Sequence, residues 1–310
     1  MRFRNSLHVI IDNFPLVFKV LLYNLVTGVL FFGVSYTIVT INLNSIVSSA
    51  EAQEIFSLLG KFFTALISGD TVFLQGFEDT FLAAAGDFMH MLSTRMGAII
   101  WSIVGLCLLY LFSRFLNGLC TFTAGALVGD KMQTYSRGKF SSAFFANLGR
   151  AALYEVIYVP LSFLYTVLTV AVCWFLFFYA LSFLPLLLTV VLAASAIVFL
   201  QTVKYTLISS WMPRILCGGE KVGAAFGASL KQGKGFWSRF ALFLVFIYLI
   251  ILMNVLGALG TLGSMLFISV PLSYLVLLGV QFVSYFEDSG RKYFIGYGKV
   301  AGGEEPPEVL

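Results

Sequence analysis

The sequence predicts an all-α fold: a polytopic membrane helical bundle of six transmembrane helices in three hairpins, plus two extracytoplasmic amphipathic helices. Of the 310 residues, 59% are hydrophobic and only 11% are charged, whereas a soluble domain carries about 25% charged residues. Six apolar runs each reach the roughly 20 residues that a helix needs to cross a bilayer. We therefore expect a single integral membrane domain over residues 1–290, followed by a cytoplasmic tail over 291–310.

The six predicted spans follow from the apolar runs, in chain order. They lie near residues 16–41, 97–117, 156–180, 186–208, 239–259 and 263–285. The first run is too long for the core of a cleaved signal peptide, so we expect the protein to retain it. Only "LSFLPL" (181–186) joins the third span to the fourth, and only "GTLG" (260–263) joins the fifth to the sixth. Connections this short predict tight antiparallel hairpins.

The positions of Lys and Arg near the span ends predict the orientation. Basic residues are concentrated in segments 129–150 and 213–239 and before residue 20, whereas acidic residues outnumber basic ones in segment 44–95. We therefore expect both termini in the cytoplasm and segment 44–95 outside. The predicted location is the bacterial cytoplasmic (inner) membrane, which the chain crosses several times.

The outer segment 44–95 predicts two amphipathic helices. Phe and Leu recur at helical spacing over 54–67 and again over 71–92. The residues "SGD" (68–70) separate the two helices and can cap the second one. Such a pair can lie in the outer membrane interface or fold over the bundle as a lid, and the sequence leaves both arrangements open.

A weak internal repeat is visible at an offset of ninety residues. Arg114 aligns with Lys204, and "GDK" (129–131) aligns with "GEK" (219–221). In each copy a span ends, a basic segment follows and a new span begins. Two parallel copies imply an axis along the membrane normal, although so few identities can also arise by chance. The repeat accounts for topology without requiring any function.

The stretch "GAAFGASLKQGKGFWSRF" (223–240) raises the question of a phosphate-binding loop. That loop requires G-x-x-x-x-G-K-[ST] between a strand and a helix. Here Gly227 and Gly233 enclose five residues instead of four, and Gly235 follows Lys234 where a Ser or Thr would bind magnesium. No predicted strand precedes the stretch. We therefore interpret it as a basic segment at the membrane surface and not as a nucleotide site.

No motif for catalysis or metal binding is recognisable in the sequence. The two histidines, His8 and His90, are expected on opposite sides of the membrane, and no pair of cysteines has the spacing of a metal site. The chain also lacks the nucleophile, base and orienting group that a hydrolase needs. We expect a non-enzymatic protein with no catalytic residues, metal, cofactor or nucleic-acid partner.

Basic residues near the cytoplasmic span ends are the candidate contacts for an anion or a lipid headgroup. They are Arg114, Lys204, Lys131, Lys221, Lys231, Lys234 and Arg239. Each Lys or Arg close to an anionic membrane surface contributes about 1 kcal/mol to binding. The expected partners are membrane lipids, anionic ones in particular, or a protein. Alternatively, these residues only enforce the orientation of the spans.

Ionisable residues inside spans are functional candidates because their burial is costly. Arg114 and Lys204 lie inside predicted spans and Glu155 lies at the start of one, all near the cytoplasmic ends. There the two cations can snorkel to the interface, and Glu155 can pair with either. The alternative is a cationic vestibule, which would make the chain a small transporter or channel for an anionic solute. Deeper in the membrane, Asn254 is expected to join neighbouring helices.

One local pattern suggests a family. In "WMPRIL…GAAFGASLKQGKGFW" (211–237), a span ends at a proline, and an alanine-rich amphipathic helix then ends in S-L-x-x-G-K-x-F-W. The pattern resembles the multipass membrane domain of membrane-anchored glycerophosphodiester phosphodiesterases and related uncharacterised six-span bacterial proteins. The resemblance implies an architectural role for the matched residues Pro213, Ala224, Ser229, Leu230, Lys234, Phe236 and Trp237. It implies no enzymatic activity, because no segment corresponds to the phosphodiesterase catalytic domain.

Overall fold

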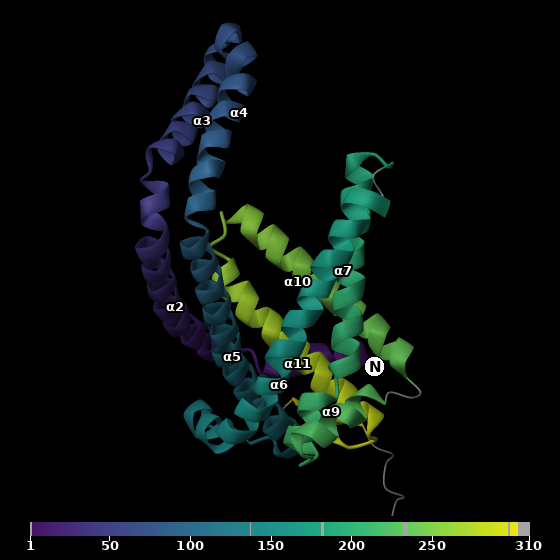
Figure 1. Cartoon of the computed structure of the whole chain (residues 1–310). Coiled ribbons are helices and arrows are strands. Elements are labelled where there is room, and N and C mark those ends of the chain that lie inside the picture. Colours follow the sequence, from purple (N-terminus) through teal and green to yellow (C-terminus); the bar gives the residue numbers. More distant parts are fainter. Residues whose placement is uncertain (1, 137, 181–182, 232–234, 297, 303–310) are drawn as a thin grey trace, which may run out of the picture. The chain divides into compact units, whose positions relative to one another are not determined.

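The structure, a computed structural model, describes residues 2–136, 138–180, 183–231, 235–296 and 298–302. Most of these residues are helical (Figure 1). Six helices in these ranges are long and apolar enough to cross a membrane: Pro15–Ile41, Met96–Thr134, Phe140–Ala180, Leu188–Cys217, Phe236–Gly260 and Leu266–Asp288. The prediction of a mainly helical protein with six candidate membrane spans is thereby confirmed.

The elements follow one another in an almost entirely helical order. They are α1 (Arg2–Asp12), α2 (Pro15–Val47), α3 (Ala50–Ser68), α4 (Thr71–Thr94), α5 (Met96–Thr134), α6 (Phe140–Phe175), a π-helical turn (Leu176–Ala180), α7 (Leu186–Ile208), α8 (Trp211–Cys217), α9 (Val222–Leu230), α10 (Phe236–Gly260), α11 (Leu266–Asp288), β1 (Tyr293–Gly296) and β2 (Lys299–Ala301). The chain divides into two compact units. Residues 27–113 form the smaller unit, and residues 1–26 with 114–310 form the larger one.

The smaller unit contains α3 and α4, which pack along each other (Figure 1). The Ser49 side chain accepts a hydrogen bond from the backbone N–H of Ala52 and caps α3. The Asp70 carboxylate accepts one from Phe73 in the same way and caps α4. Between the two helices, Gly69 has φ of 73°, a conformation that glycine adopts without strain. The rings of Phe62 and Phe77, 4.5 Å apart, join the helices below this turn.

The hydrophobic core of the larger unit is organised around Trp211. This side chain is fully buried, and its Nε1 donates a hydrogen bond of 2.9 Å to the carbonyl of Val222. Its ring contacts Tyr154 of α6 at 4.5 Å and Phe226 of α9 at 4.6 Å between centroids. Trp211 therefore fixes the short helices α8 and α9 against α6.

Helices α10 and α11 pack against each other and against neighbouring helices. Asn254 of α10 donates to Ser273 Oγ (3.0 Å) and accepts from Ser269 Oγ (2.6 Å), both on α11. The role predicted for Asn254 in joining helices is therefore confirmed. At the other end of α11, Gly279 allows a close approach of α1, since a Cβ there would lie 2.8 Å from Cγ1 of Ile10.

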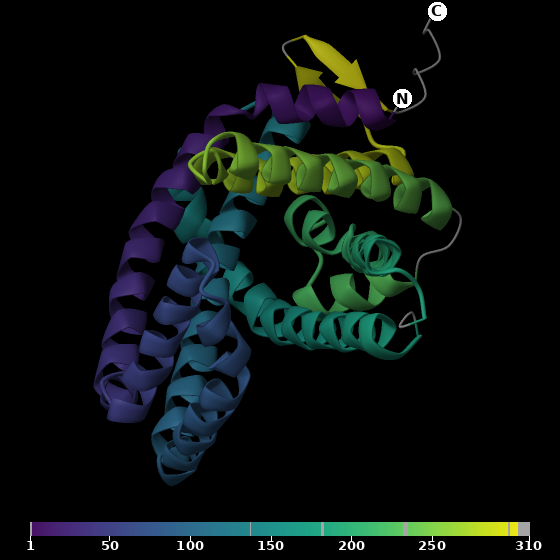
Figure 2. The same ribbon diagram turned by 90° about the horizontal axis from the view of Figure 1, so that it is seen from above.

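A small β-hairpin lies in the segment that we expected to be a plain tail. Strands β1 and β2 are antiparallel, with Tyr293 opposite Ala301. Tyr293 is 1% exposed, and its ring packs on Phe286 of α11 at 5.4 Å. The hairpin also contacts α1, beside which it lies in Figure 2. Burial of Tyr293 fastens this short hairpin to α11. Residues 303–310 of the predicted cytoplasmic tail lie outside the described residues.

Candidate functional site

The larger unit contains a group of charged and aromatic side chains within its spans, here called the intramembrane cluster. It comprises Arg114 on α5, Glu155, Tyr158, Ser162 and Tyr165 on α6, and Lys204 and Tyr205 on α7. The α6 members recur every three or four residues, so they share one face of that helix. The structure thus brings together the three ionisable residues that the sequence predicted inside spans.

Lys204 lies inside the protein and is only 8% exposed. Its Nζ donates a hydrogen bond of 2.6 Å to Ser162 Oγ. The same nitrogen lies 5.6 Å from the ring centres of Tyr158 and Tyr205 and 5.9 Å from that of Tyr165. The negative faces of aromatic rings stabilise a cation at this range. The tyrosines therefore supply part of the stabilisation that water would give an exposed ammonium group.

Glu155 is 2% exposed and lies against Gly118 of α5. A side chain at position 118 would overlap the Glu155 carboxylate, so the glycine makes room for it. Oε2 of Glu155 is buried and has no hydrogen-bond partner among the described residues. Arg114, one turn before Gly118, interacts electrostatically with both Glu155 and Lys204. The cluster therefore combines two formally cationic groups with one formally anionic group.

Other candidate residues predicted from the sequence lie at the surface. Lys221 and Lys231 flank α9 at its two ends, and both are exposed. Lys139, immediately before α6, and Arg150 within α6 were not among the predicted candidates, but they are exposed as well. Helix α9 contacts α6, so these four cations belong to neighbouring elements. Lys234 lies outside the described residues.

Two predicted candidates, Lys131 and Arg239, are held in ion pairs. Lys131 Nζ lies 2.7 Å from the Asp12 carboxylate and also donates to the Asp12 carbonyl. Arg239 is 7% exposed, and its Nη1 lies 2.8 Å from Asp288 Oδ2. Arg214 pairs with Glu220 in the same manner, at 2.8 Å. The structure thus places Lys131 and Arg239 in contacts that fasten the fold.

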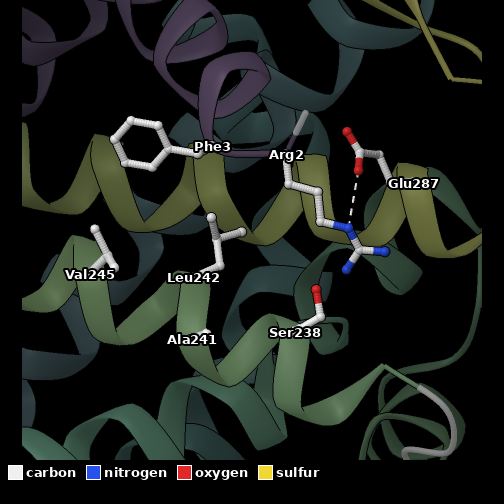
Figure 3. Close-up of a pocket in the computed structure, with 7 residues that line it drawn as sticks. All are labelled: Arg2, Phe3, Ser238, Ala241, Leu242, Val245 and Glu287. Carbon is white, nitrogen blue, oxygen red and sulfur yellow. Dashed lines mark hydrogen bonds and ion pairs between the residues drawn. The ribbon is translucent and has the colours of Figure 1, made fainter.

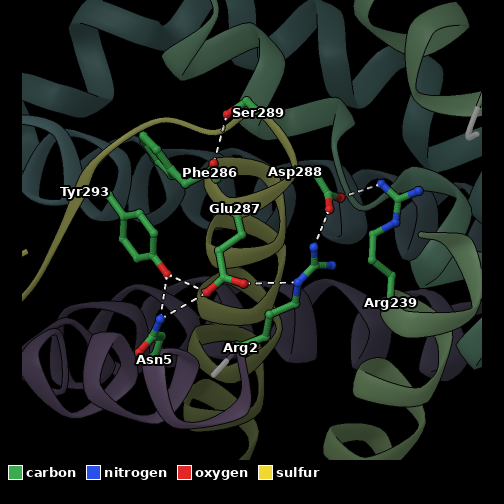
Figure 4. Close-up of polar contacts among 8 residues, drawn as sticks. All are labelled: Arg2, Asn5, Arg239, Phe286, Glu287, Asp288, Ser289 and Tyr293. Carbon is green, nitrogen blue, oxygen red and sulfur yellow. Dashed lines mark hydrogen bonds and ion pairs between the residues drawn. The ribbon is translucent and has the colours of Figure 1, made fainter. Parts of the chain in front are cut away.

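A polar network, here called the terminal network, joins α1 to α11, α10 and β1 (Figure 4). Arg2 Nε lies 3.0 Å from Glu287 and its Nη2 lies 2.6 Å from Asp288. Asn5 donates to Glu287 and to the Tyr293 hydroxyl, each at 3.0 Å. The Tyr293 hydroxyl in turn donates to Glu287 at 2.9 Å. Sequence reasoning missed this network because the partners of Arg2 and Asn5 lie 282 to 288 positions further along the chain. The pairs Glu287–Tyr293 and Arg239–Asp288 are closer, at 6 and 49 positions.

The protonation of Tyr293 is set by its surroundings in this network. Burial, together with the nearby Glu287 carboxylate, raises the pKa of the Tyr293 hydroxyl above its ordinary value. The hydroxyl therefore remains a donor under ordinary conditions. This donor satisfies one oxygen of Glu287, whose other oxygen accepts from Arg2.

Neither a metal site nor a similar known protein indicates the function directly. Within the described ranges, no group of three or more His, Cys, Asp or Glu side chains could hold a metal ion. Comparisons with protein-family models, with curated proteins and with solved structures find no match for this chain. The function is therefore inferred from the charged and polar side chains themselves.

Proposed function

We propose that the chain is a non-catalytic multipass membrane protein that binds anionic lipid headgroups through exposed cations on one membrane face. One observation supports this most. The carboxylates of Asp12, Glu220, Glu287 and Asp288 are all engaged in ion pairs. Among the described residues, the exposed cations Lys139, Arg150, Lys221 and Lys231 have no such partner. These four residues, here called the basic rim, therefore present uncompensated positive charge.

The proposed topology places the basic rim at the inner leaflet. Three helical hairpins span a bacterial inner membrane, with both termini in the cytoplasm and segment 44–95 on the outer side. All Lys and Arg residues except Lys61 and Arg95 lie in residues 1–26 and 114–310. This distribution agrees with the excess of basic residues in cytoplasmic loops. The resemblance of 211–237 to a membrane-anchoring domain is compatible with an architectural role, with lipid or a protein as the partner.

A charge-neutralised variant tests this proposal. The four basic-rim residues contribute up to about 4 kcal/mol to binding an anionic surface. If half of this is realised, changing all four to Gln lowers the preference for phosphatidylglycerol over phosphatidylethanolamine by roughly 30-fold. Native mass spectrometry of the detergent-solubilised full chain measures that preference. Lys61→Gln, in the smaller unit, is the control and should behave as wild type.

The same experiment can also contradict the proposal. An unchanged preference in the quadruple variant would show that the basic rim only orients the spans during insertion. The proposal of lipid binding through the rim would then be wrong.

The intramembrane cluster favours a second candidate, movement of an anionic solute across the membrane. The supporting observation is that Lys204 and Glu155 are buried, because costly charges inside spans often mark transport pathways. Wild-type protein in proteoliposomes would then take up radiolabelled inorganic phosphate or chloride, and Lys204→Gln would not. Uptake no faster than in protein-free vesicles would count against this candidate.

A further inference from the structure

An open groove of about 610 Å³ lies between the start of α1 and the first turns of α10 (Figure 3). Ligand pockets commonly have volumes of about 300–1,000 Å³. Arg2, Ser238 and Glu287 line its polar end. The remaining lining residues are apolar, so the groove is polar at one end and apolar along the rest.

The apolar wall is a single stripe of a membrane-spanning helix. Ala241, Leu242 and Val245 follow Ser238 at intervals of three, four and seven residues, which places all four on one face of α10. The stripe runs about 10 Å from the first turn of the span towards its middle. The small Ala241 side chain leaves the wall hollow. Phe3 of α1 forms the facing side, with its ring 5.0 Å from that of Phe246.

The polar end has a hydrogen-bond donor without an acceptor. Arg2 uses Nε and Nη2 in its two ion pairs, whereas its buried Nη1 has no partner among the described residues. Arg239, next to Ser238, pairs with Asp288 through Nη1, and it is not one of the residues that line the groove. Since the unpartnered atom of Arg2 is an N–H group, a ligand that completes this end must supply an acceptor.

We propose that this groove binds one membrane glycerophospholipid. Its phosphate oxygens accept hydrogen bonds from Arg2 and Ser238, and one acyl chain lies against Phe3, Ala241, Leu242 and Val245. Guanidinium groups bind phosphate through short charge-assisted hydrogen bonds. The apolar stripe belongs to a span, so the ligand that reaches it comes from the bilayer. This proposal depends on the proposed function in one respect, which is that the ligand is a membrane lipid.

The groove and the basic rim differ in what they recognise. In the terminal network Arg2 and Arg239 are balanced by Glu287 and Asp288, so net charge does not attract the ligand. The groove is therefore expected to bind phosphatidylethanolamine about as well as phosphatidylglycerol. A dioleoylglycerol without phosphate is expected to bind weakly. The rim, in contrast, distinguishes lipids by headgroup charge.

Filling the groove provides the test. Ala241→Phe occupies the hollow wall and leaves every ion pair of the terminal network in place. Native mass spectrometry of the full chain in detergent, titrated with dioleoyl phosphatidylethanolamine, should show one saturable site in wild type. The affinity of that site should fall at least about tenfold in Ala241→Phe. The matched control is Ala194→Phe, at an exposed alanine of α7 outside the groove, which should bind as wild type does.

Several results would overturn the proposal. Equal binding by Ala241→Phe and wild type would show that the lipid is not in the groove. Binding of dioleoylglycerol as tight as that of the phospholipid would show that no phosphate is recognised. If Ala241→Phe does not fold, Val245→Phe replaces it, because Val245 is 47% exposed. The quadruple basic-rim variant should keep the phosphatidylethanolamine site, which separates failure of the groove from failure of the rim.

Discussion

Packing of α1 against α11 depends on Gly279, and replacing this glycine gives a quantitative prediction. A Cβ at position 279 would lie 2.8 Å from Ile10 Cγ1 and 3.5 Å from its Cδ1. Ile10 is 6% exposed and cannot swing into open space. Overpacking of this kind costs about 1–3 kcal/mol, whereas Gly→Ala inside a helix gains about 1 kcal/mol of helix propensity. We expect Gly279→Ala to be destabilised by about 1 kcal/mol.

The matched control is Gly149→Ala in α6, where no atom lies within 4 Å of the added Cβ. That variant gains only the helix propensity, so the two variants should differ by about 2 kcal/mol. The assay is unfolding of the detergent-solubilised protein, followed by near-ultraviolet circular dichroism. A second variant, Ile10→Ala, removes the opposing atoms, and Gly279→Ala should cost nothing in that background. Equal stability of Gly279→Ala and Gly149→Ala would refute the close packing of α1 on α11.

Two further predictions concern polar contacts. Ser162→Ala removes the acceptor of the buried Lys204 ammonium and should lower the free energy of unfolding by about 1–3 kcal/mol. The control is Ser195→Ala, at an exposed site where the hydroxyl is hydrogen-bonded within its own helix. Its free energy of unfolding should stay within about 0.5 kcal/mol of the wild-type value. Equal unfolding midpoints for the two would contradict the role of Ser162. The second prediction is a fall in stability above about pH 10, the ordinary pKa of tyrosine. There the unfolded chain loses the Tyr293 proton while the folded chain keeps it, because the folded pKa is raised. Unfolding followed from pH 8 to 11 should show a shallower fall in Tyr293→Phe, and identical slopes would argue against burial of this hydroxyl.

The spans could be predicted because hydrophobic length is a local property of the sequence. Their ends were less accessible to sequence reasoning. Helix α5 continues to Thr134, beyond the predicted span 97–117. Its second half buries Cys120, Phe122 and Val128 in the protein core, so apolar residues there serve packing within the protein. Composition alone does not distinguish that burial from burial in lipid.

The ionisable residues of the candidate site could be predicted from the sequence more readily than the contacts that they make. Arg114, Glu155 and Lys204 stood out because charge is rare inside apolar runs. The sequence left snorkelling to the interface as one option for Lys204, and the structure instead places its ammonium among three tyrosines. The spacing of Tyr158, Ser162 and Tyr165 on one face of α6 was a signal that could have indicated this. The partners of Arg2 and Asn5 had no local signal at all.

The terminal network has a consequence for the order of assembly. Asn5 hydrogen-bonds to Tyr293, 288 positions later in the chain. At about 5–20 residues per second, a ribosome needs roughly 15 to 60 s to synthesise the chain between them. During that time α1 has none of its α11 or β1 contacts, although the spans in between can already insert. Docking of α1 is therefore a late event in biogenesis, and it brings the earliest and the latest described elements of the chain together.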